Sequence, residues 1–184
     1  MPWQPACGDA WACSAKGQAR WTRSRTARTG ACARLKRETD CGRGWLLEDR
    51  WGSGEVASPG VLYNPASLPG LVAQSGGTRL GPATFSLKQG ECEVVSLDVI
   101  VQAQGIGASL VREVEAAARQ ADDRRLWLIT IEDNPEALRF YHRRGFRPTT
   151  IHREAIAHSR ELKPCISETS PFGIPLRDEI ELEL

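Results

Sequence analysis

A glycine-containing junction at residues 102–107 (QAQGIG) separates two segments of different periodicity. The apolar, β-branched run at residues 92–101 predicts a buried strand, and apolar residues at three- and four-residue spacing from Ile106 to Ala121 predict a helix. A strand that passes through glycine into a helix leaves the first N–H groups of the helix without partners, and the helix dipole there favours an anion. Glycine lets the backbone approach that anion closely. The junction therefore predicts an anion site of the kind that often holds a phosphate.

Two shorter strand patterns precede this junction. The predicted strands cover residues 71–74, 83–87 and 92–101, and turn signals occupy residues 75–77 and 89–90. Strands joined by such short turns predict an antiparallel meander. Pro82 removes a ladder donor, so we expect a bulge or an edge position there.

The short apolar segment at residues 126–131 predicts a further strand after the helix. The order strand, helix, strand implies a right-handed crossover, which places residues 126–131 parallel to residues 92–101. Both strands then end on the side of the glycine junction, where α/β proteins bind their ligands.

Two common phosphate-binding motifs do not fit the junction. A dinucleotide-binding turn needs a third glycine, but Ser109 and Leu110 occupy that region, and an antiparallel meander does not suit a doubly wound sheet. A P-loop is excluded because no Gly-Lys-Ser/Thr follows.

Residues 134–146 (NPEALRFYHRRGF) predict a second helix, with Asn134 as its N-cap, Pro135 in the first position and Gly145 ending it. Together with the junction, this segment resembles the GCN5-related N-acetyltransferase (GNAT) family. QAQGIG is similar to the family motif Q/R-x-x-G-x-G/A, and residues 134–146 are similar to its second signature N-x-x-A-x-x-x-Y-x-x-x-G-F. The C-terminal GIPLRDEIELEL resembles a bacterial GNAT subfamily whose acceptor is unidentified.

The resemblance implies an α/β fold with a mixed sheet, in which an antiparallel meander leads into a β-α-β crossover with splayed parallel strands. It implies an N-acetyltransferase that moves an acetyl group from acetyl-CoA to an amine of a small molecule or protein, with no metal. The cofactor-binding residues that it implies are Leu97, Val99, Gln102, Gln104, Gly105, Ile106, Gly107, Ala108, Asn134 and Tyr141.

Within that set, backbone N–H groups of residues 104–108 would hold the CoA diphosphate. The backbone of Leu97 and Val99 would pair with the pantetheine arm, and Asn134 would hydrogen-bond to it. Tyr141 would donate a proton to the departing thiolate. Two alternatives stay open, since Tyr141 could be a core aromatic and Asn134 could serve only as an N-cap.

The implied mechanism is direct attack of a neutral amine, whose proton a base or a water removes. Glu93 is the first candidate for this base and Glu91 the second, because both lie on or beside the strand that ends at the junction. Strand alternation could equally turn either side chain into solvent.

Bulk composition fits a soluble, cytoplasmic protein. The chain has 184 residues, of which 41% are hydrophobic and 26% charged, and no apolar run is long enough to span a bilayer. Six cysteines without a C-x-x-C spacing favour reduced thiols over disulfides or zinc.

The net charge of +1 is unevenly distributed. Residues 1–37 contain eight basic residues and one acidic residue, a net charge of +7, which leaves −6 for the remainder. Residues 1–30 hold almost no branched aliphatics, so we expect a disordered basic extension followed by one domain at residues 31–184. Three interpretations of that extension stay open: a dispensable segment, a transit peptide, which it resembles faintly, or an arm that binds nucleic acid or an acidic partner. Of these, binding to nucleic acid is disfavoured.

The remaining elements follow from local patterns. We expect an edge strand at residues 31–37, a helix from Asp40 to Trp51, a proline-rich loop at 53–70, a strand at 146–151, a helix at 152–162 and a loop at 163–178. Residues 179–184 (EIELEL) alternate, which predicts a half-exposed strand and leaves a homodimer open. A GNAT-like module that binds acyl-CoA without turnover is the alternative function.

Overall fold

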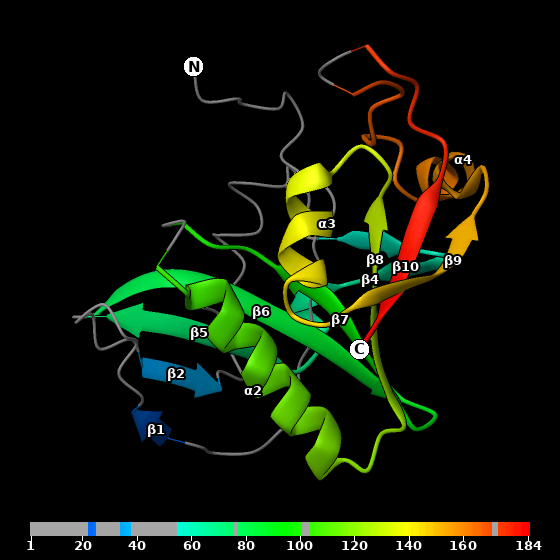
Figure 1. The fold of residues 1–184 in the computed structure, drawn as a ribbon. Coiled ribbons are helices and arrows are strands. Elements are labelled where there is room, and N and C mark those ends of the chain that lie inside the picture. The colour runs from blue at the N-terminus through cyan, green and yellow to red at the C-terminus, as the bar shows by residue number, and fades with distance from the viewer. Residues whose placement is uncertain (1–21, 25–33, 38–54, 76, 101–103, 171–172) are drawn as a thin grey trace.

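A computed structural model describes residues 22–24, 34–37, 55–75, 77–100, 104–170 and 173–184. Its centre is an eight-stranded mixed sheet in the order β1-β2-β5-β6-β7-β8-β10-β9 (Figure 1). The strands of this sheet are β1 (Thr22–Ser24), β2 (Arg34–Arg37), β5 (Gly70–Ser75), β6 (Thr78–Lys88), β7 (Glu91–Leu97), β8 (Arg125–Ile131), β9 (Arg147–His152) and β10 (Glu179–Glu183). The fold class implied by the sequence is confirmed.

The predicted antiparallel meander is present as β5, β6 and β7. Gln89 and Gly90 connect β6 to β7 with φ angles of 56° and 76°, the left-handed pair that a tight two-residue hairpin turn requires. The expectation of an edge position for Pro82 is wrong, because β6 lies between two partner strands. A register irregularity in the β5–β6 pairing lies close by, between Ala73 and Gln74.

Helix α2 (Ile106–Gln120) follows β7 and packs across the meander. Its apolar face buries Ile106, Leu110, Val111, Val114, Ala117 and Ala118 in the main core, together with Cys92 and Val94 of β7 and Leu126 and Leu128 of β8. The predicted strand-helix-strand crossover is completed by β8, which pairs in parallel with β7. Helix α3 (Pro135–His142) joins the same core through Tyr141.

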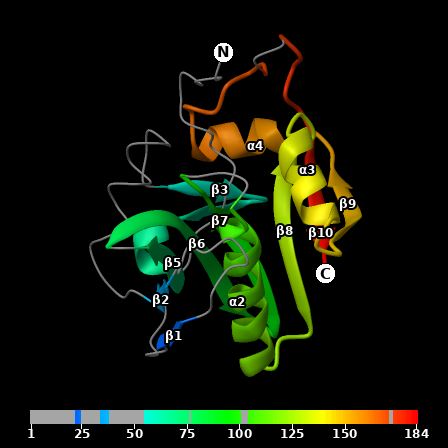
Figure 2. The same cartoon turned by 60° about the vertical axis from the view of Figure 1, so that its left-hand side comes forward.

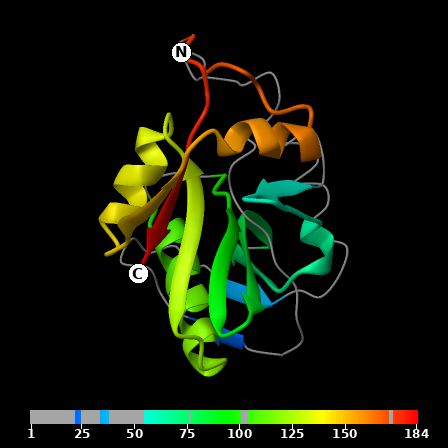
Figure 3. The same cartoon turned by 90° about the vertical axis from the view of Figure 1, so that its right-hand side faces the viewer.

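The opposite face of the sheet carries a smaller layer. A two-stranded hairpin, β3 (Val56–Ser58) and β4 (Val61–Tyr63), is followed by the 3-10 turn η1 (Pro65–Ser67). Helix α4 (Ala155–Leu162) contacts β3, and Figures 2 and 3 show both on the side away from α2. The predicted loop at residues 53–70 is therefore wrong where the hairpin forms, because Pro59 and Gly60 supply its turn instead of breaking the strands.

The C-terminal strand differs from its predicted environment. β10 lies between β8 and β9, so the sheet covers both of its edges, and Glu179 is fully buried. The predicted strand is present, but its glutamate face is only partly exposed: Glu179 contacts Ser159 of α4 and Glu181 contacts His152 of β9, while the Glu183 side chain is 36% exposed. Because both edges of β10 are already paired, this strand gives no argument for a homodimer.

The structure describes two short segments of the N-terminal region, residues 22–24 and 34–37. Thr22–Ser24, inside the segment expected to be disordered, pairs with β2, and β2 itself occupies part of the edge strand expected at residues 31–37. The rest of residues 1–30 and the expected helix from Asp40 to Trp51 lie outside the described residues. In the part of the chain that is described, no helix has the length and apolar character that crossing a membrane requires.

Candidate active site

The parallel strands β7 and β8 pair at only three positions. These are Glu91–Arg125, Cys92–Leu126 and Glu93–Trp127. Beyond Trp127, β8 continues to Ile131 with β10 as its partner, while β7 continues to Leu97 with β6. The two strands therefore separate on the side of α2's N-terminus, as the resemblance implied.

A β-bulge in β7 lies directly at this separation. Phe85 of β6 is paired with Val94 and Thr84 with Ser96, so Val95 is an extra residue without a partner position. Val94 packs in the core below α2, whereas Val95 packs with Val56 and Tyr63 of the hairpin on the other face. Bulges bend a strand and interrupt its pairing, which accounts for the departure of β7 from β8.

The backbone after the bulge is directed by its contacts with β6. The N–H groups of Asp98 and Ile100 donate to carbonyl oxygens of β6 at 3.0 and 2.8 Å. Since successive peptide groups of an extended chain point to opposite edges, the N–H groups of Leu97 and Val99 point away from β6. That is the edge from which β8 has departed, so an extended ligand could pair there as an added strand.

The N-terminus of α2 adjoins this edge. Gly105 is the N-cap with a left-handed φ of 73°, and its carbonyl accepts the first helical hydrogen bond from Ser109 N at 3.0 Å. Gly105 has no side chain to cap this end, and no acidic residue lies in the first turn. Gln104 and Gly105 are exposed, Ala108 is half-buried and Ile106 is buried. The N–H groups of the first turn are thus arranged for an anion.

Gly107 fixes how closely α2 approaches its neighbours. A Cβ at this position would lie 3.0 Å from the Phe140 ring of α3 and 3.4 Å from a methyl group of Val99. The glycine therefore brings α2, α3 and the end of β7 into one corner. Gln102, the remaining residue expected at this junction, lies outside the described residues.

Helix α3 carries the other two expected cofactor residues. Asn134 is its N-cap and accepts a hydrogen bond from Ala137 N at 3.0 Å through Oδ1, so a ligand contact would use its amide nitrogen. Tyr141 is 7% exposed and packs edge-on against Phe140 and Phe146, with ring centroids 5.0 and 5.4 Å away. The Tyr141 ring thus packs in the core, and α3 borders the corner formed by α2 and the end of β7.

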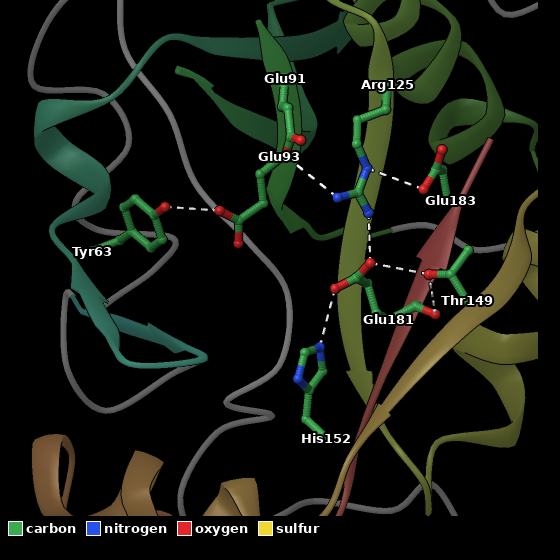
Figure 4. Close-up of polar contacts among 8 residues, drawn as sticks. All are labelled: Tyr63, Glu91, Glu93, Arg125, Thr149, His152, Glu181 and Glu183. Atoms are coloured by element: carbon green, nitrogen blue, oxygen red, sulfur yellow. Dashed lines mark hydrogen bonds and ion pairs between the residues drawn. The ribbon is translucent and has the colours of Figure 1, made fainter. Parts of the chain in front are cut away.

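Glu93, the candidate base, lies on the sheet face opposite α2 and is 4% exposed. Ser58 Oγ donates to its Oε1 at 2.6 Å. Tyr63 Oη donates to its Oε2 at 2.8 Å (Figure 4). Burial raises the pKa of Glu93, although these two hydrogen bonds and the positive charge of Lys88 act in the opposite direction. The carboxyl is therefore easier to protonate than an exposed glutamate.

Beside Glu93, a charged network joins four strands of the sheet (Figure 4). Arg125 lies 2.5 Å from Glu181, 3.0 Å from Glu183 and 3.4 Å from Glu91, and His152 Nε2 lies 3.1 Å from Glu181. Glu91, the second candidate base, is thus paired with Arg125. Its ion pair makes it a weaker base candidate than Glu93.

Cys92 adjoins Glu93 but points into the core. Burial, with the nearby carboxylates of Asp123 and Glu93, raises the pKa of its thiol to about 12. The thiol is therefore neutral near pH 7 and unsuited to nucleophilic attack. Across the described ranges, no group of three or more His, Cys, Asp or Glu side chains could hold a metal ion.

Sequence reasoning missed the two hydroxyl partners of Glu93. Ser58 and Tyr63 lie in the segment taken for a loop because of its prolines, and the bulge at Val95 was also missed. The signal for the hairpin is Pro59-Gly60 between VAS and VLY, two short strand-like runs around a turn dipeptide. A bulge that contains no glycine leaves no comparable signal.

The structure is a mixed α/β fold in which, among the described residues, β8 leaves the edge of β7 beside the N-terminus of α2. Comparisons identify its family. Residues 39–146 match the Acetyltransferase (GNAT) family. YdhI of Bacillus subtilis (strain 168) is 36% identical over 131 residues, which are 71% of this chain and 82% of YdhI. The chain belongs to the GNAT acetyltransferase family, and the resemblance seen in the sequence is confirmed.

Solved structures share this fold at low sequence identity. IAA acetyltransferase from Bacillus cereus ATCC 14579 matches with a TM-score of 0.62 and 21% identity, covering 83% of this chain and 98% of that one. A GNAT family acetyltransferase from Elizabethkingia anophelis with acetyl-CoA bound matches with a TM-score of 0.61 and 18% identity, covering 83% and 97%.

Proposed function

We propose that this chain is an N-acetyltransferase that moves an acetyl group from acetyl-CoA to an amine by direct attack. The observation that carries the proposal is the separation of β7 from β8 after Glu93–Trp127, next to an uncapped helix N-terminus. A diphosphate needs such free N–H groups, and an extended amide-bearing arm needs such an unpaired strand edge. Family membership and the acetyl-CoA bound to the Elizabethkingia anophelis protein support the same cofactor.

Backbone N–H groups of residues 104–108 would hold the diphosphate of CoA, and Leu97 and Val99 would pair with the pantetheine arm. Asn134 would reach that arm through its amide nitrogen, because Oδ1 caps α3. When bound, acetyl-CoA supplies an activated thioester carbonyl for the amine to attack. Holding both reactants in place supplies much of the rate.

Two side chains of this chain would move protons. Glu93 would accept the amine proton, through a water because the residue is only 4% exposed. Tyr141 would donate its proton to the thiolate. The neutral, buried thiol of Cys92 argues against a covalent acetyl-enzyme and favours direct attack.

The burial of both Glu93 and Tyr141 also favours a second candidate, a module that binds acyl-CoA without turnover. Release of free thiol from acetyl-CoA with a panel of amines separates the two. We expect turnover with at least one amine in the wild type, and a loss of about 10²-fold or more in kcat/KM for Glu93→Gln. Tyr141→Phe should lower kcat with little change in KM for acetyl-CoA.

Glu115→Gln, on the outer part of α2, is the matched control and should keep wild-type turnover. Saturable acetyl-CoA binding with no thiol release on any amine would contradict the enzyme and support the binding module.

A further inference from the structure

The β3–β4 hairpin contacts the base candidate and the bulge at the same time. Val56 and Tyr63 of the hairpin form a small cluster with Val95, the bulged residue of β7. Two residues earlier on β7, Glu93 receives hydroxyl donors from the same hairpin. The hairpin is therefore attached to the central strand at the point where β7 and β8 separate.

Each oxygen of the Glu93 carboxyl group accepts one hydrogen bond from the hairpin. Ser58 Oγ donates to Oε1 at 2.6 Å and Tyr63 Oη donates to Oε2 at 2.8 Å, and both donor residues are themselves buried. One donor on each oxygen fixes both the position and the rotation of the carboxylate plane. Each oxygen keeps a second lone pair, so the group can still accept a proton.

The geometry points to a positioning role: Ser58 and Tyr63 hold Glu93 in the orientation in which it acts as the base of acetyl transfer. The inference rests on the proposed function and names the two residues that would make Glu93 competent. Neither residue would touch the substrate in this role.

Other charged groups near Glu93 also affect the stability of its charged form. Lys88 of β6 favours the charged carboxylate, and its Nζ lies 4.9 Å from the centre of the Tyr63 ring. Glu181 of β10 disfavours it, while Arg125 and His152 are paired with Glu181. Burial is the largest effect and disfavours the charged carboxylate of Glu93. The hydrogen bonds from Ser58 and Tyr63 are the nearest interactions that stabilise this charged form.

Removing either hydroxyl should therefore raise the pKa of Glu93 further. A base works in its ionised form, so the acid limb of the pH profile of kcat should move to higher pH. At a pH on the acid limb of the wild-type profile we expect kcat to fall about 10-fold in Tyr63→Phe and in Ser58→Ala, with KM for acetyl-CoA unchanged. Tyr63→Phe keeps the ring on Val95, so the fold should be retained.

Ser159→Ala is the matched control. It removes another buried Ser–Glu hydrogen bond, 2.7 Å from Ser159 Oγ to Glu179 Oε1, which joins α4 to β10 and does not involve Glu93. An effect of lost stability alone would appear in Ser159→Ala too. The titration of Glu93 should not shift in Ser159→Ala.

The test combines two readouts on the full chain. The side-chain carboxyl ¹³C resonance of Glu93, assigned with Glu93→Gln, is titrated in the wild type, Tyr63→Phe, Ser58→Ala and Ser159→Ala without ligand. The acid limb of kcat is then measured with the amine that gives turnover. We expect the titration midpoint of Glu93 and the acid limb of kcat to move to higher pH together in Tyr63→Phe and Ser58→Ala. Both should stay at their wild-type positions in Ser159→Ala.

An unshifted Glu93 resonance in folded Tyr63→Phe and Ser58→Ala would overturn the inference. A shifted resonance with an unmoved acid limb would also overturn it, because the hairpin would then hold a structural carboxyl. If Glu93→Gln itself turned over normally, the failure would lie in the assignment of the base and not in the hairpin.

Discussion

Glu93 and Trp127 are the last partners that β7 and β8 share, and Val95 bulges out of β7 two residues later. The pair marks the point where two parallel strands that start side by side begin to separate. After it, the peptide groups of Leu97 and Val99 face an edge that β8 has left. The strand edge where we propose that acetyl-CoA binds and the sheet face that carries Glu93 meet at this pair.

Gly105 should be needed for acetyl-CoA binding beyond its effect on stability. Its φ of 73° costs a residue with a Cβ about 1 kcal/mol, although an added Cβ would meet no atom within 4 Å. Gly105→Ala should therefore lose about 1 kcal/mol of unfolding free energy, measured by urea denaturation. It should also bind acetyl-CoA at least 10-fold more weakly by calorimetry, because the first-turn N–H groups shift.

Gly60→Ala provides the control for backbone strain. Gly60 has the same φ of 73° and equally open surroundings, but lies in the turn of the β3–β4 hairpin. It should lose a similar amount of stability and keep wild-type affinity for acetyl-CoA. Equal weakening in both variants would show that α2's N-terminus is not the diphosphate site.

Arg125 should stabilise the sheet more than an ordinary surface charge does. Its side chain is 25% exposed and faces three carboxylates, which would repel one another without it. Arg125→Met should cost about 1–3 kcal/mol of unfolding free energy at pH 7. Arg119→Met, which breaks only the exposed pair with Glu115, should cost less than about 0.5 kcal/mol.

The cost of Arg125→Met should also depend on pH. Burial acts to raise the pKa of Glu181, but hydrogen bonds from Arg125, His152 and Thr149 outweigh it and hold that pKa below its ordinary value. A carboxyl with a lowered pKa stabilises the fold above its unfolded pKa of roughly 4.3, and that contribution is lost as the pH falls through the folded pKa. The difference between wild type and variant should shrink from pH 7 toward pH 3. A constant difference would contradict this account of the network.

Cys92→Ala should preserve acetyl transfer. The Cys92 thiol is buried and its pKa is raised to about 12, so it does not supply a thiolate near neutral pH. We expect about 1 kcal/mol of lost stability from the smaller side chain, and kcat within about threefold of the wild type. Loss of turnover in a folded Cys92→Ala, or ping-pong kinetics in the wild type, would refute direct attack.

The local structure at the N-termini of α2 and α3 could be predicted from the sequence because its signals are local. The glycine at residue 105, the helical spacing from Ile106 and the Asn134-Pro135 start of α3 each act within a few residues. The central β-α-β unit followed from the same patterns.

The environment of Glu93 and of β10 could not be predicted in this way. Alternation in residues 179–184 specifies two faces but not which element covers each, and α4 reaches the glutamate side at Glu179 through Ser159. Likewise, Ser58 and Tyr63 reach Glu93 across about 30 positions of sequence, and such contacts leave no local pattern. Long-range packing, more than secondary structure, determines which carboxylate is a candidate base.

Thermal unfolding of the wild type with increasing acetyl-CoA tests the central claim most directly. A ligand at 100 times its Kd stabilises the folded state by about 2.7 kcal/mol, which for a chain of this size raises Tm by about 5–10 °C. We predict a rise that grows with the logarithm of the acetyl-CoA concentration above Kd, that Gly60→Ala retains and that Gly105→Ala loses in large part. No rise in wild-type Tm at any acetyl-CoA concentration up to about 1 mM, roughly the upper end of the KM values of enzymes, would contradict a CoA site at the separation of β7 and β8.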